Sequence, residues 1–401
     1  MTQVVHTTAP APADHRRLRL IVILGALTAI APLSIDMYLP ALPRIAADLS
    51  TGAVQAQLTL TACVAGLAAG QAIAGPLSDR WGRRRPLLIG LLAYAAASLL
   101  CVVAPTVETF IAFRLIQGAA GAAGIVIARA IVRDLYDGAE AARFFSMLML
   151  VNGLAPILAP VLGGQILRVM PWPGVFAVLS GIGVAMFLAA LLGMRETLPP
   201  DRRATATATL PAFRTLLADR PFVAYAVSGG LAFAAMFTYI SGSPFVLQDI
   251  YGMSPQAFSV VFGVNALGIV LAGQVSGRLA GRVSLTGLLA TGLAVISIGG
   301  ATLLIAVLTD LGLPAVLPAL FLVVSGQGLV LPNATALALS GRPANVAGSA
   351  SALLGLAQFG IGGAAAPLAG VLGPGTAVPM AVTIAATALA AALAARVASQ
   401  N

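Results

Sequence analysis

The sequence contains no lysine, and charged residues of every kind are scarce in it. They make up 9% of the 401 residues, against roughly 25% in an ordinary soluble domain. So few charges cannot cover the surface of a water-soluble fold, and 59% of the residues are hydrophobic. The composition therefore excludes a soluble globular protein and a lysine-rich surface for nucleic acid. It favours a chain that lies within a lipid bilayer.

Histidine and cysteine are nearly absent, which excludes further kinds of site. Cys63 and Cys101 both lie in apolar stretches, unlike the clustered thiolates of a metal site or the cysteines of a disulfide framework. His6 and His15 lie in the Pro/Ala-rich start of the chain, which is predicted to form a disordered tail. No histidine is left to carry a proton within the membrane, and we expect neither a metal nor a cofactor.

Long apolar segments are what the sequence has in abundance. A membrane-spanning helix needs about 20 apolar residues, and segments of this kind recur along the chain between charges or Pro/Gly turns. The predicted spans cover residues 18–42, 54–77, 86–104, 107–131, 142–167, 173–194, 221–247, 256–279, 285–308, 313–340, 345–372 and 376–395. Twelve such spans predict an all-α membrane protein.

The longest polar stretch, residues 195–220, divides these spans six from six. We therefore predict two pseudo-symmetric six-helix bundles, residues 18–194 and 221–396, joined by a cytoplasmic linker. Residues 1–17 and 397–401 are predicted to be cytoplasmic tails. The pattern Gly-Gln followed by Gly-x-Leu also occurs in the second span and again in the eighth. Parallel repeats of this kind place a substrate site between two bundles near the midplane, so the arrangement predicts a transporter.

The arginines predict the orientation of the chain. With the amino terminus in the cytoplasm, only Arg44 and Arg168 of the 22 arginines lie on the outer side of the membrane, and Arg114 lies within a span. The others lie at the cytoplasmic face or, for Arg129, just inside it. This positive-inside pattern predicts a multi-pass plasma-membrane protein, in the bacterial inner or cell membrane, with both termini in the cytoplasm.

The loop after the second span reads GPLSDRWGRRRPL and resembles the loop signature of the major facilitator superfamily. Eight positions carry the resemblance: Gly75, Leu77, Asp79, Arg80, Gly82, Arg83, Arg84 and Leu87. The resemblance implies a conformational latch, with Asp79 near the start of the eleventh span and Arg83 near Asp134. Its residues would be Gly75, Asp79, Arg80, Gly82, Arg83 and Asp134. Positive-inside charge alone would explain the arginines but not the spacing of glycine and aspartate.

Two further motifs resemble signatures of the same superfamily. Arg114-x-x-Gln117-Gly118 in the fourth span resembles its basic intramembrane motif, and an arginine so deep must be compensated. The fifth span resembles the antiporter motif of exporters, although its first proline stands where the pattern usually has a small residue. The motif residues are Gly153, Pro156, Pro160, Gly163 and Gly164. A merely flexible membrane helix is the alternative explanation, because glycine and proline are common in such helices.

Four segments resemble the Bcr/CflA group of drug exporters within this superfamily. They are SIDMYLPALP, SPFVLQDIYGMSP, LPNATALAL and AGSASALLG. The resemblance implies antiport of protons against small drugs, with bicyclomycin, chloramphenicol-like compounds or sulfonamides as substrate classes. Transport of an endogenous metabolite, such as a sugar or an amino-acid derivative, is the alternative. The sequence has no phosphate-binding loop of an ATP-driven pump and no catalytic cluster of an enzyme.

Asp36 is the only acidic residue in the interior of a predicted span, because the others lie at span ends, in loops or in the tail. A carboxylate in a low dielectric gains proton affinity and a nearby cation lowers it again, so such a group can load and release a proton. We therefore predict that Asp36 carries the proton and that Arg114, at comparable depth, tunes it directly or through carbonyl groups of the first helix. The alternatives are an Asp36 that stays charged or hydrated, and an Arg114 that is only a structural anchor.

Polar and aromatic residues within the spans are candidates for the wall of a substrate cavity, since such cavities are mainly apolar with a few polar anchors. The candidates are Tyr38, Gln117, Asn152, Tyr239, Asn265, Asn333 and Gln358. Each of them also fits a role in bonding one membrane helix to another. The expected partners are a small-molecule drug, protons and the lipid bilayer, and the protein is expected to be monomeric.

Overall fold

The fold is described from a computed structural model that covers residues 14–136, 138–200, 210–340, 344–371 and 375–399. Within these ranges the side chains at 14–18, 138–143, 145–147, 149–150, 152, 210–213, 344–349, 351–352 and 399 are not described. The described part of the chain consists of helices and short connections, and it contains no β-sheet. This confirms the predicted all-α class.

Twelve long helices lie within the described ranges and match the predicted spans. They are α1 (Asp14–Asp36), α3 (Ala53–Trp81), α4 (Arg84–Val102), α5 (Val107–Leu135), α6 (Gly138–Val169), α7 (Pro173–Gly193), α9 (Arg220–Phe245), α10 (Pro255–Leu279), α11 (Leu285–Leu308), α12 (Leu313–Leu339), α13 (Ala344–Ala365) and α14 (Val378–Ser399). Eleven of the helices are long and apolar enough, over their described residues, to cross a membrane. The twelfth, α6, is 32 residues long.

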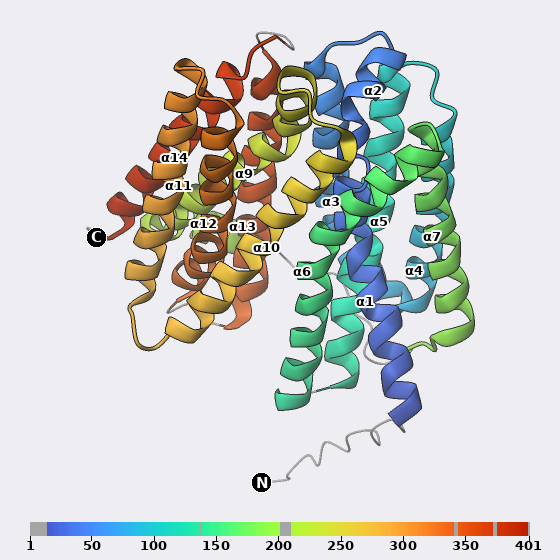
Figure 1. Ribbon diagram of the computed structural model, residues 1–401. Helices are drawn as coiled ribbons and strands as arrows, with labels where there is room; N and C mark the ends of the chain where they lie inside the picture. Colours follow the sequence, from blue (N-terminus) through green and yellow to red (C-terminus); the bar gives the residue numbers. More distant parts are fainter. Residues whose placement is uncertain (1–13, 137, 201–209, 341–343, 372–374, 400–401) are drawn as a thin grey trace.

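The helices form two bundles with the same internal arrangement (Figure 1). In order along the chain, α1 and α3 to α7 of the first bundle correspond to α9 and α10 to α14 of the second. Contacts such as α3 with α5, α4 with α7 and α1 with α6 recur as α10 with α12, α11 with α14 and α9 with α13. Between the bundles, α6 contacts α10 and α3 contacts α13, which are equivalent pairs under this correspondence. The structure therefore has the predicted pseudo-symmetry.

Glycine allows the closest contact within the first bundle, between α3 and α5. A Cβ atom on Gly66 or Gly70 would overlap backbone carbonyls of α5, and one on Gly118 would overlap the carbonyl of Cys63. In the second bundle, a Cβ on Gly328 of α12 would overlap the carbonyl of Ile269 in α10. Apolar side chains gain little by leaving lipid for protein, so close backbone packing of this kind is a main source of cohesion between membrane helices.

The two bundles are joined most firmly at one end, which we call the closed end. It is formed by η1 (Leu39–Ala41), α2 (Leu42–Asp48), η3 (Val246–Ile250) and η4 (Ala366–Gly370). Three hydrogen bonds between described residues cross from bundle to bundle here: Gln57 Nε2 to Ser241 O at 3.3 Å, Thr61 Oγ1 to Gly363 O at 3.2 Å, and Gln256 Nε2 to Gly164 O at 2.9 Å.

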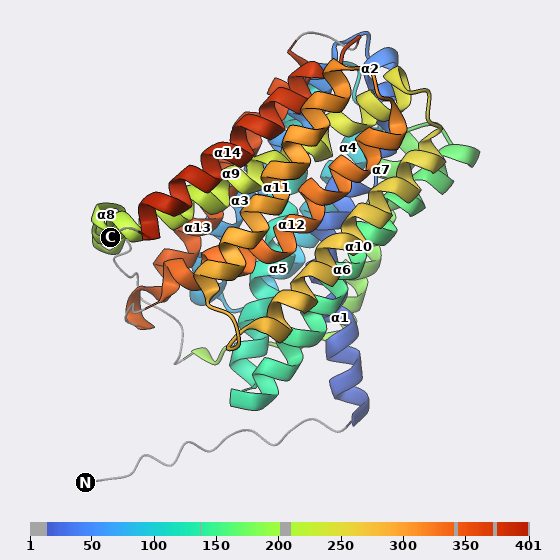
Figure 2. The same cartoon turned by 60° about the vertical axis from the view of Figure 1, so that its left-hand side comes forward.

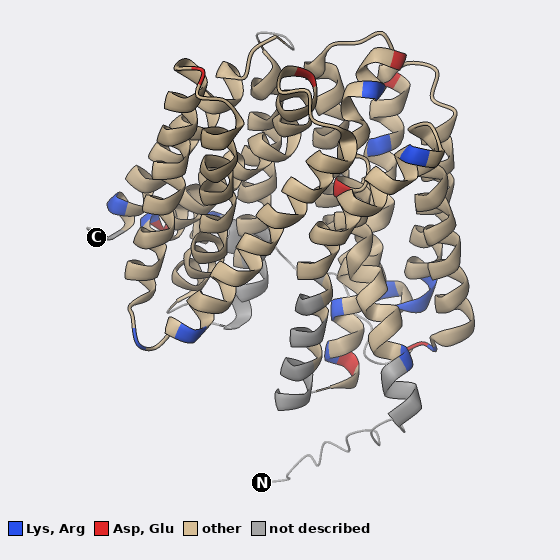
Figure 3. Ribbon diagram, in the orientation of Figure 1, with Lys and Arg blue, Asp and Glu red and all other residues tan. Residues whose placement is uncertain are grey.

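Most of the basic residues gather at the opposite end, which we call the arginine end (Figure 3). α1 begins at this end, and the loops after α3 and α10 also lie there. Arg44 in α2 and Arg168 at the last turn of α6 belong instead to the closed end. The charge asymmetry read from the sequence is therefore an asymmetry between the two ends of the folded molecule.

The structure differs from the predicted boundaries in three respects, which concern a break in the first span, the two terminal helices and the linker. The first span does not run unbroken to residue 42, because α1 ends at Asp36 and the chain continues through η1 into α2. Pro40 and Pro43 follow the break, and proline both lacks an N–H donor and disfavours helix at the residue before it. α1 also starts at Asp14, inside the predicted tail, and α14 continues to Ser399.

The third difference is a short helix, α8 (Leu210–Ala218), in the predicted linker. It contacts α9 and α13, and it lies at the edge of the second bundle (Figure 2). Leu216 is buried in this contact, with 3% of its surface exposed. The helix was missed because nine residues are far too few to register as a membrane span. Residues 201–209 of the linker lie outside the described part of the chain.

Gly118→Ala should destabilise the first bundle. The added methyl group must displace the backbone of α3, and overpacking of this kind costs about 1–3 kcal/mol. We expect a lower melting temperature in detergent, measured by fluorescence-detected size-exclusion chromatography of heated samples. Gly181→Ala is the matched control, since a Cβ there meets nothing within 4 Å. Equal melting temperatures for the two variants would contradict the packing argument.

Candidate functional site

A cavity of about 590 Å³ lies between the two bundles. Its wall takes residues from α1, α3, α5 and α6 on one side and from α9, α10, α12 and α13 on the other. The wall is mainly apolar and aromatic on the side of the second bundle, with Phe233, Phe237, Phe262 and Phe359. A cavity of this size and lining suits a small organic molecule.

Asp36 lines this cavity and is the last residue of α1. Only 5% of its surface is exposed, and no hydrogen bond or ion pair joins its carboxylate to another described residue. After Asp36 the chain turns at Met37 and Tyr38 and then enters η1. Gly163 of α6 fits against this turn, and a Cβ at Gly163 would overlap the carbonyl of Met37. The carboxyl group is thus buried without a fixed partner.

Tyr239 of α9 is the polar side chain of the opposite wall that interacts electrostatically with Asp36. Its hydroxyl oxygen accepts a hydrogen bond of 2.9 Å from Asn265 Nδ2, and its ring stacks on Phe262 with 5.5 Å between centroids. Ser243 of the same helix is a second polar neighbour of this hydroxyl group. The only acidic residue of the described cavity wall therefore shares the cavity with a hydroxyl group that is fixed on the opposite wall.

Arg114 lies behind the end of α1 and is fully buried. Its Nη2 donates a hydrogen bond of 2.9 Å to the carbonyl of Ser34, and its Nη1 donates to Gln117. The guanidinium carbon also stands 4.3 Å from the ring centroid of Tyr38, a cation–π contact. No ion pair joins Arg114 to Asp36 within the described part of the structure. Its link to the carboxyl group runs through the backbone of α1, two residues before Asp36.

The structure places the seven candidate cavity residues in different surroundings. Tyr239 and Gln358 line the cavity, and Asn265 touches it through its hydrogen bond to Tyr239. Tyr38 and Gln117 do not line it. Both are fully buried beside Arg114, where Tyr38 bonds Thr59 and Gln117 bonds Ser98.

Asn333 also lies away from the cavity wall. Its Nδ2 bonds Ser276 Oγ at 2.8 Å and ties α12 to α10. The side chain of Asn152 lies outside the described part. For Tyr38, Gln117 and Asn333, the helix-packing alternative agrees with the geometry, because their polar groups are used up in bonds between helices.

Four of the five residues of the antiporter motif face the second bundle or the end of α1, and the fifth, Pro160, is buried. Pro156 lines the cavity. The carbonyl of Gly164 accepts the hydrogen bond from Gln256 of α10, and a Cβ on Gly153 would lie 3.4 Å from Val270 of the same helix. Together with Gly163, these residues make α6 the helix of the first bundle that contacts α10.

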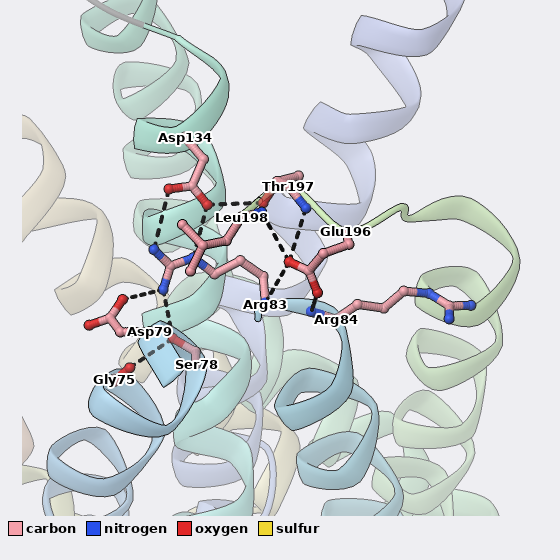
Figure 4. Close-up of polar contacts among 9 residues, drawn as sticks. All are labelled: Gly75, Ser78, Asp79, Arg83, Arg84, Asp134, Glu196, Thr197 and Leu198. Carbon is pink, nitrogen blue, oxygen red and sulfur yellow. Dashed lines mark hydrogen bonds and ion pairs between the residues drawn. The ribbon is translucent and has the colours of Figure 1, made fainter. Parts of the chain in front are cut away.

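A second polar cluster lies at the arginine end, around Arg83 (Figure 4). Arg83 Nε donates to Asp134 Oδ2 at 2.9 Å, and Nη1 donates to Ser78 Oγ at 2.9 Å and to Asp79. Burial lowers the pKa of Arg83, but its hydrogen bonds to Asp134 and Asp79 raise the pKa above its usual value overall. The structure thus brings Arg83 and Asp134 together, as the loop resemblance implied.

The remaining latch residues have separate places. Gly82 has a φ of 87°, a conformation that glycine adopts without strain. The carbonyl of Gly75 accepts a bond of 2.8 Å from Ser78. Arg80 is exposed and takes no part in the described bonds of the cluster. The side chains at the start of α13, where Asp79 was expected to find its neighbour, lie outside the described part.

Glu196, just after α7, belongs to the same cluster and was not predicted (Figure 4). Its carboxylate accepts bonds from the backbone N–H of Arg83 at 2.7 Å and of Arg84 at 3.1 Å, at the start of α4. It also accepts from the N–H groups of Thr197 and Leu198. Partial burial raises the pKa of Glu196, but these four backbone donors lower it below the usual value. The one sequence signal was an acid directly after the sixth span.

Two further polar residues of the cavity wall were not predicted as site residues. Gln71 of α3 and Arg129 of α5 both line the cavity. Arg129 counted only as a charge at the cytoplasmic face, because its position near the end of a predicted span gave no sign that it faces inward.

Comparisons with known proteins agree with this architecture. The Major Facilitator Superfamily matches residues 24–367. A Bacillus subtilis (strain 168) protein named "Uncharacterized MFS-type transporter YdgK" is 42% identical over 373 residues, covering 92% of each chain. The "Bicyclomycin resistance protein homolog" of Haemophilus influenzae is 30% identical over 90% of this chain and 92% of that protein. The crystal structure of nucleoside transporter NupG has a TM-score of 0.77 at 14% identity, over 96% of this chain and 99% of that one.

Glu196→Gln should lower the melting temperature at neutral pH by roughly 2–6 °C, because a charged acceptor of several hydrogen bonds is lost. A lowered folded-state pKa means that the stabilisation is complete above about 4.3, the usual pKa of glutamate, and is lost as the pH falls through the lowered value. The difference from wild type, measured in detergent from pH 7 to pH 3, should therefore close on acidification. Asp310→Asn, in an exposed loop, is the control and should show little difference at any pH.

Proposed function

The chain belongs to the Major Facilitator Superfamily, and we propose that it is a proton-coupled antiporter that exports small amphipathic drugs such as bicyclomycin or chloramphenicol-like compounds. The observation that carries the proposal is Asp36, the one carboxyl group among the described residues that line a cavity between both bundles. The resemblance to a relative named for bicyclomycin resistance supports the substrate class. Family and fold are those of multi-pass membrane transporters and not of enzymes.

Alternating access follows from the arrangement of the bundle contacts. The bonds that cross between bundles lie at the closed end, and the cavity extends from Asp36 to Arg129, toward the arginine end. With the arginine end in the cytoplasm, as positive-inside charge favours, the cavity receives cargo from the cytoplasm. Opening of the closed end and closing of the arginine end then release it outside the inner membrane.

Exchange of a proton for cargo requires that the two compete for one site. A carboxyl group in an apolar cavity is far more easily accommodated when it is neutral. Asp36 has no described ion-pair partner that would keep it charged, so cargo or a proton must satisfy it. A proton taken from the outer side and displaced by cargo on the cytoplasmic side gives antiport.

Arg114 serves this mechanism as a positioning residue. It holds the carbonyl of Ser34 at the end of α1 and thereby fixes where the Asp36 carboxyl group enters the cavity. Of the two roles weighed from the sequence, we assign Arg114 tuning through a carbonyl group of the first helix, and this hydrogen bond also anchors the helix end.

The cluster around Arg83 supplies the proposed latch. Arg83 bonds Asp134 and Asp79, and so clamps the ends of α3 and α5 together. Glu196 adds the end of α7 and the start of α4 to the same clamp. We assign it the role of keeping the arginine end of the first bundle rigid while the bundles move.

Asp36→Asn should abolish proton-coupled efflux, because an amide cannot exchange a proton. In everted membrane vesicles carrying the variant, addition of chloramphenicol or bicyclomycin should release no protons, whereas wild type should. The control Asp310→Asn removes an exposed carboxylate and should leave the coupling intact. Near-normal coupling in Asp36→Asn would reject the assignment. If expression of the protein changes the accumulation of a metabolite but leaves drug efflux unaffected, an endogenous metabolite is the favoured cargo.

Tyr239→Phe should weaken coupling without abolishing drug binding. The change removes the hydroxyl group that faces Asp36 and leaves the stack on Phe262. We expect the pH profile of efflux to shift while the apparent KM for the drug changes little. Tyr225→Phe, a buried tyrosine of the same helix that is outside the cavity wall, should keep the wild-type profile. A purely structural Tyr239 would instead lower the rate equally at every pH.

A further inference from the structure

We propose that Arg129 binds an anionic group of the cargo, so that beside neutral drugs the cavity takes amphipathic organic acids and holds each acid more tightly than its neutral analogue. This inference rests on the proposed function and extends its substrate class. The observation behind it is an exposed arginine in the cavity wall. No hydrogen bond or ion pair holds its guanidinium among the described residues.

The buried and half-buried arginines of the first bundle contrast with Arg129. Arg83 is held by two carboxylates, Arg84 by the carbonyls of Met194 and Leu191, and Arg114 by the carbonyl of Ser34. None of the five N–H donors of Arg129 is taken by another described residue, so among these residues they remain available to whatever occupies the cavity.

Asp36 and Arg129 are the only charged residues in the described cavity wall. α1 and α5 are antiparallel, since Gly124 packs against Leu27 while Arg114 reaches Ser34. By the helical rise of about 1.5 Å per residue, the Cα atoms of Asp36 and Arg129 lie roughly 20 Å apart along the helices. Helical side chains lean toward the start of their helix, so these two lean toward each other. The charged groups therefore stand at two ends of one elongated cavity.

The guanidinium group favours one class of ligand. Its planar fork of donors matches a carboxylate, sulfonate or phosphate group bidentately. On the opposite wall, Phe233 stacks with Phe237 at 5.7 Å and meets Phe359 edge-on at 5.4 Å, and all three line the cavity. An elongated aromatic acid would place its anionic group on the first bundle and its apolar body on the second. Cargo of this kind contacts both bundles, which move relative to each other during transport.

Arg133 provides a matched control on the same helix. It lies four residues further along α5, is exposed, and is absent from the cavity wall. A general attraction of positive charge at the cytoplasmic face would involve both arginines equally. Binding within the cavity involves Arg129 alone.

The experiment measures binding of biphenylcarboxylate and of its methyl ester to purified protein in detergent, by equilibrium dialysis with radiolabelled compounds. Arg129→Gln should weaken binding of the acid by about tenfold or more, the usual effect of losing a hydrogen bond between charged groups, and leave the ester unchanged. Arg129→Lys should restore part of the loss, and Arg133→Gln should behave as wild type. The same four proteins in everted vesicles should show the change in KM for the acid, with little change in kcat.

Several outcomes would overturn the proposal. They are equal losses for acid and ester, unchanged binding of the acid in Arg129→Gln, equal effects of Arg129→Gln and Arg133→Gln, and no binding of the acid by wild type. Dialysis requires neither a pH gradient nor transport. Failure of the antiport proposal would appear separately, as selective binding of the acid without proton-coupled efflux in vesicles.

Discussion

The hydrogen bond from Arg114 to the carbonyl of Ser34 is the interaction on which the site depends. A helix that ends inside the bilayer leaves its last carbonyl groups without intrahelical partners, and lipid offers none. α1 ends at Asp36, where the N–H of Met37 bonds Leu33 and Arg114 bonds Ser34. The helix can therefore stop at this depth and present a carboxyl group to the cavity. Without the buried Arg114, both the end of α1 within the bilayer and the burial of Asp36 there would cost more free energy.

The pseudo-symmetry shows how the two bundles have come to differ. In the second bundle, Gln327 of α12 donates to the carbonyl of Ala232 in α9, just as Arg114 of α5 donates to α1. The neutral amide satisfies one carbonyl group and brings no charge. Both charged residues of the described cavity wall, Asp36 and Arg129, consequently lie on the first bundle, while the second contributes aromatic rings and Tyr239. One repeat carries the ionic chemistry and the other the apolar surface.

Depth in the membrane could be predicted from the sequence, whereas the direction in which a side chain points could not. The spans, the two bundles and the intramembrane position of Asp36 followed from apolar length and from the rarity of charge. Tyr38, in the turn after α1, and Asn333 of α12 were placed at plausible depth, but neither lines the cavity. These helices are apolar all round, so no amphipathic pattern separates the cavity face from the packing face. Glu196 and Arg129 were missed for a related reason, because a charge near a span end looks the same whether it faces solvent, a helix end or a cavity.

The distribution of bond types decides which contacts can open. Within the described part of the first bundle, ionic bonds around Arg83 join helix to helix and do not cross to the second bundle. The described bonds that do cross are three neutral ones to backbone carbonyls, each worth a net of about 0.5–1.5 kcal/mol, or about 1.5–4.5 kcal/mol together. A free energy of that size is within reach of the differential binding of cargo or of a proton. The closed end can therefore separate while each bundle stays intact, and a single titrating carboxyl group beside that end, facing Tyr239 across the interface, is placed to bias the separation.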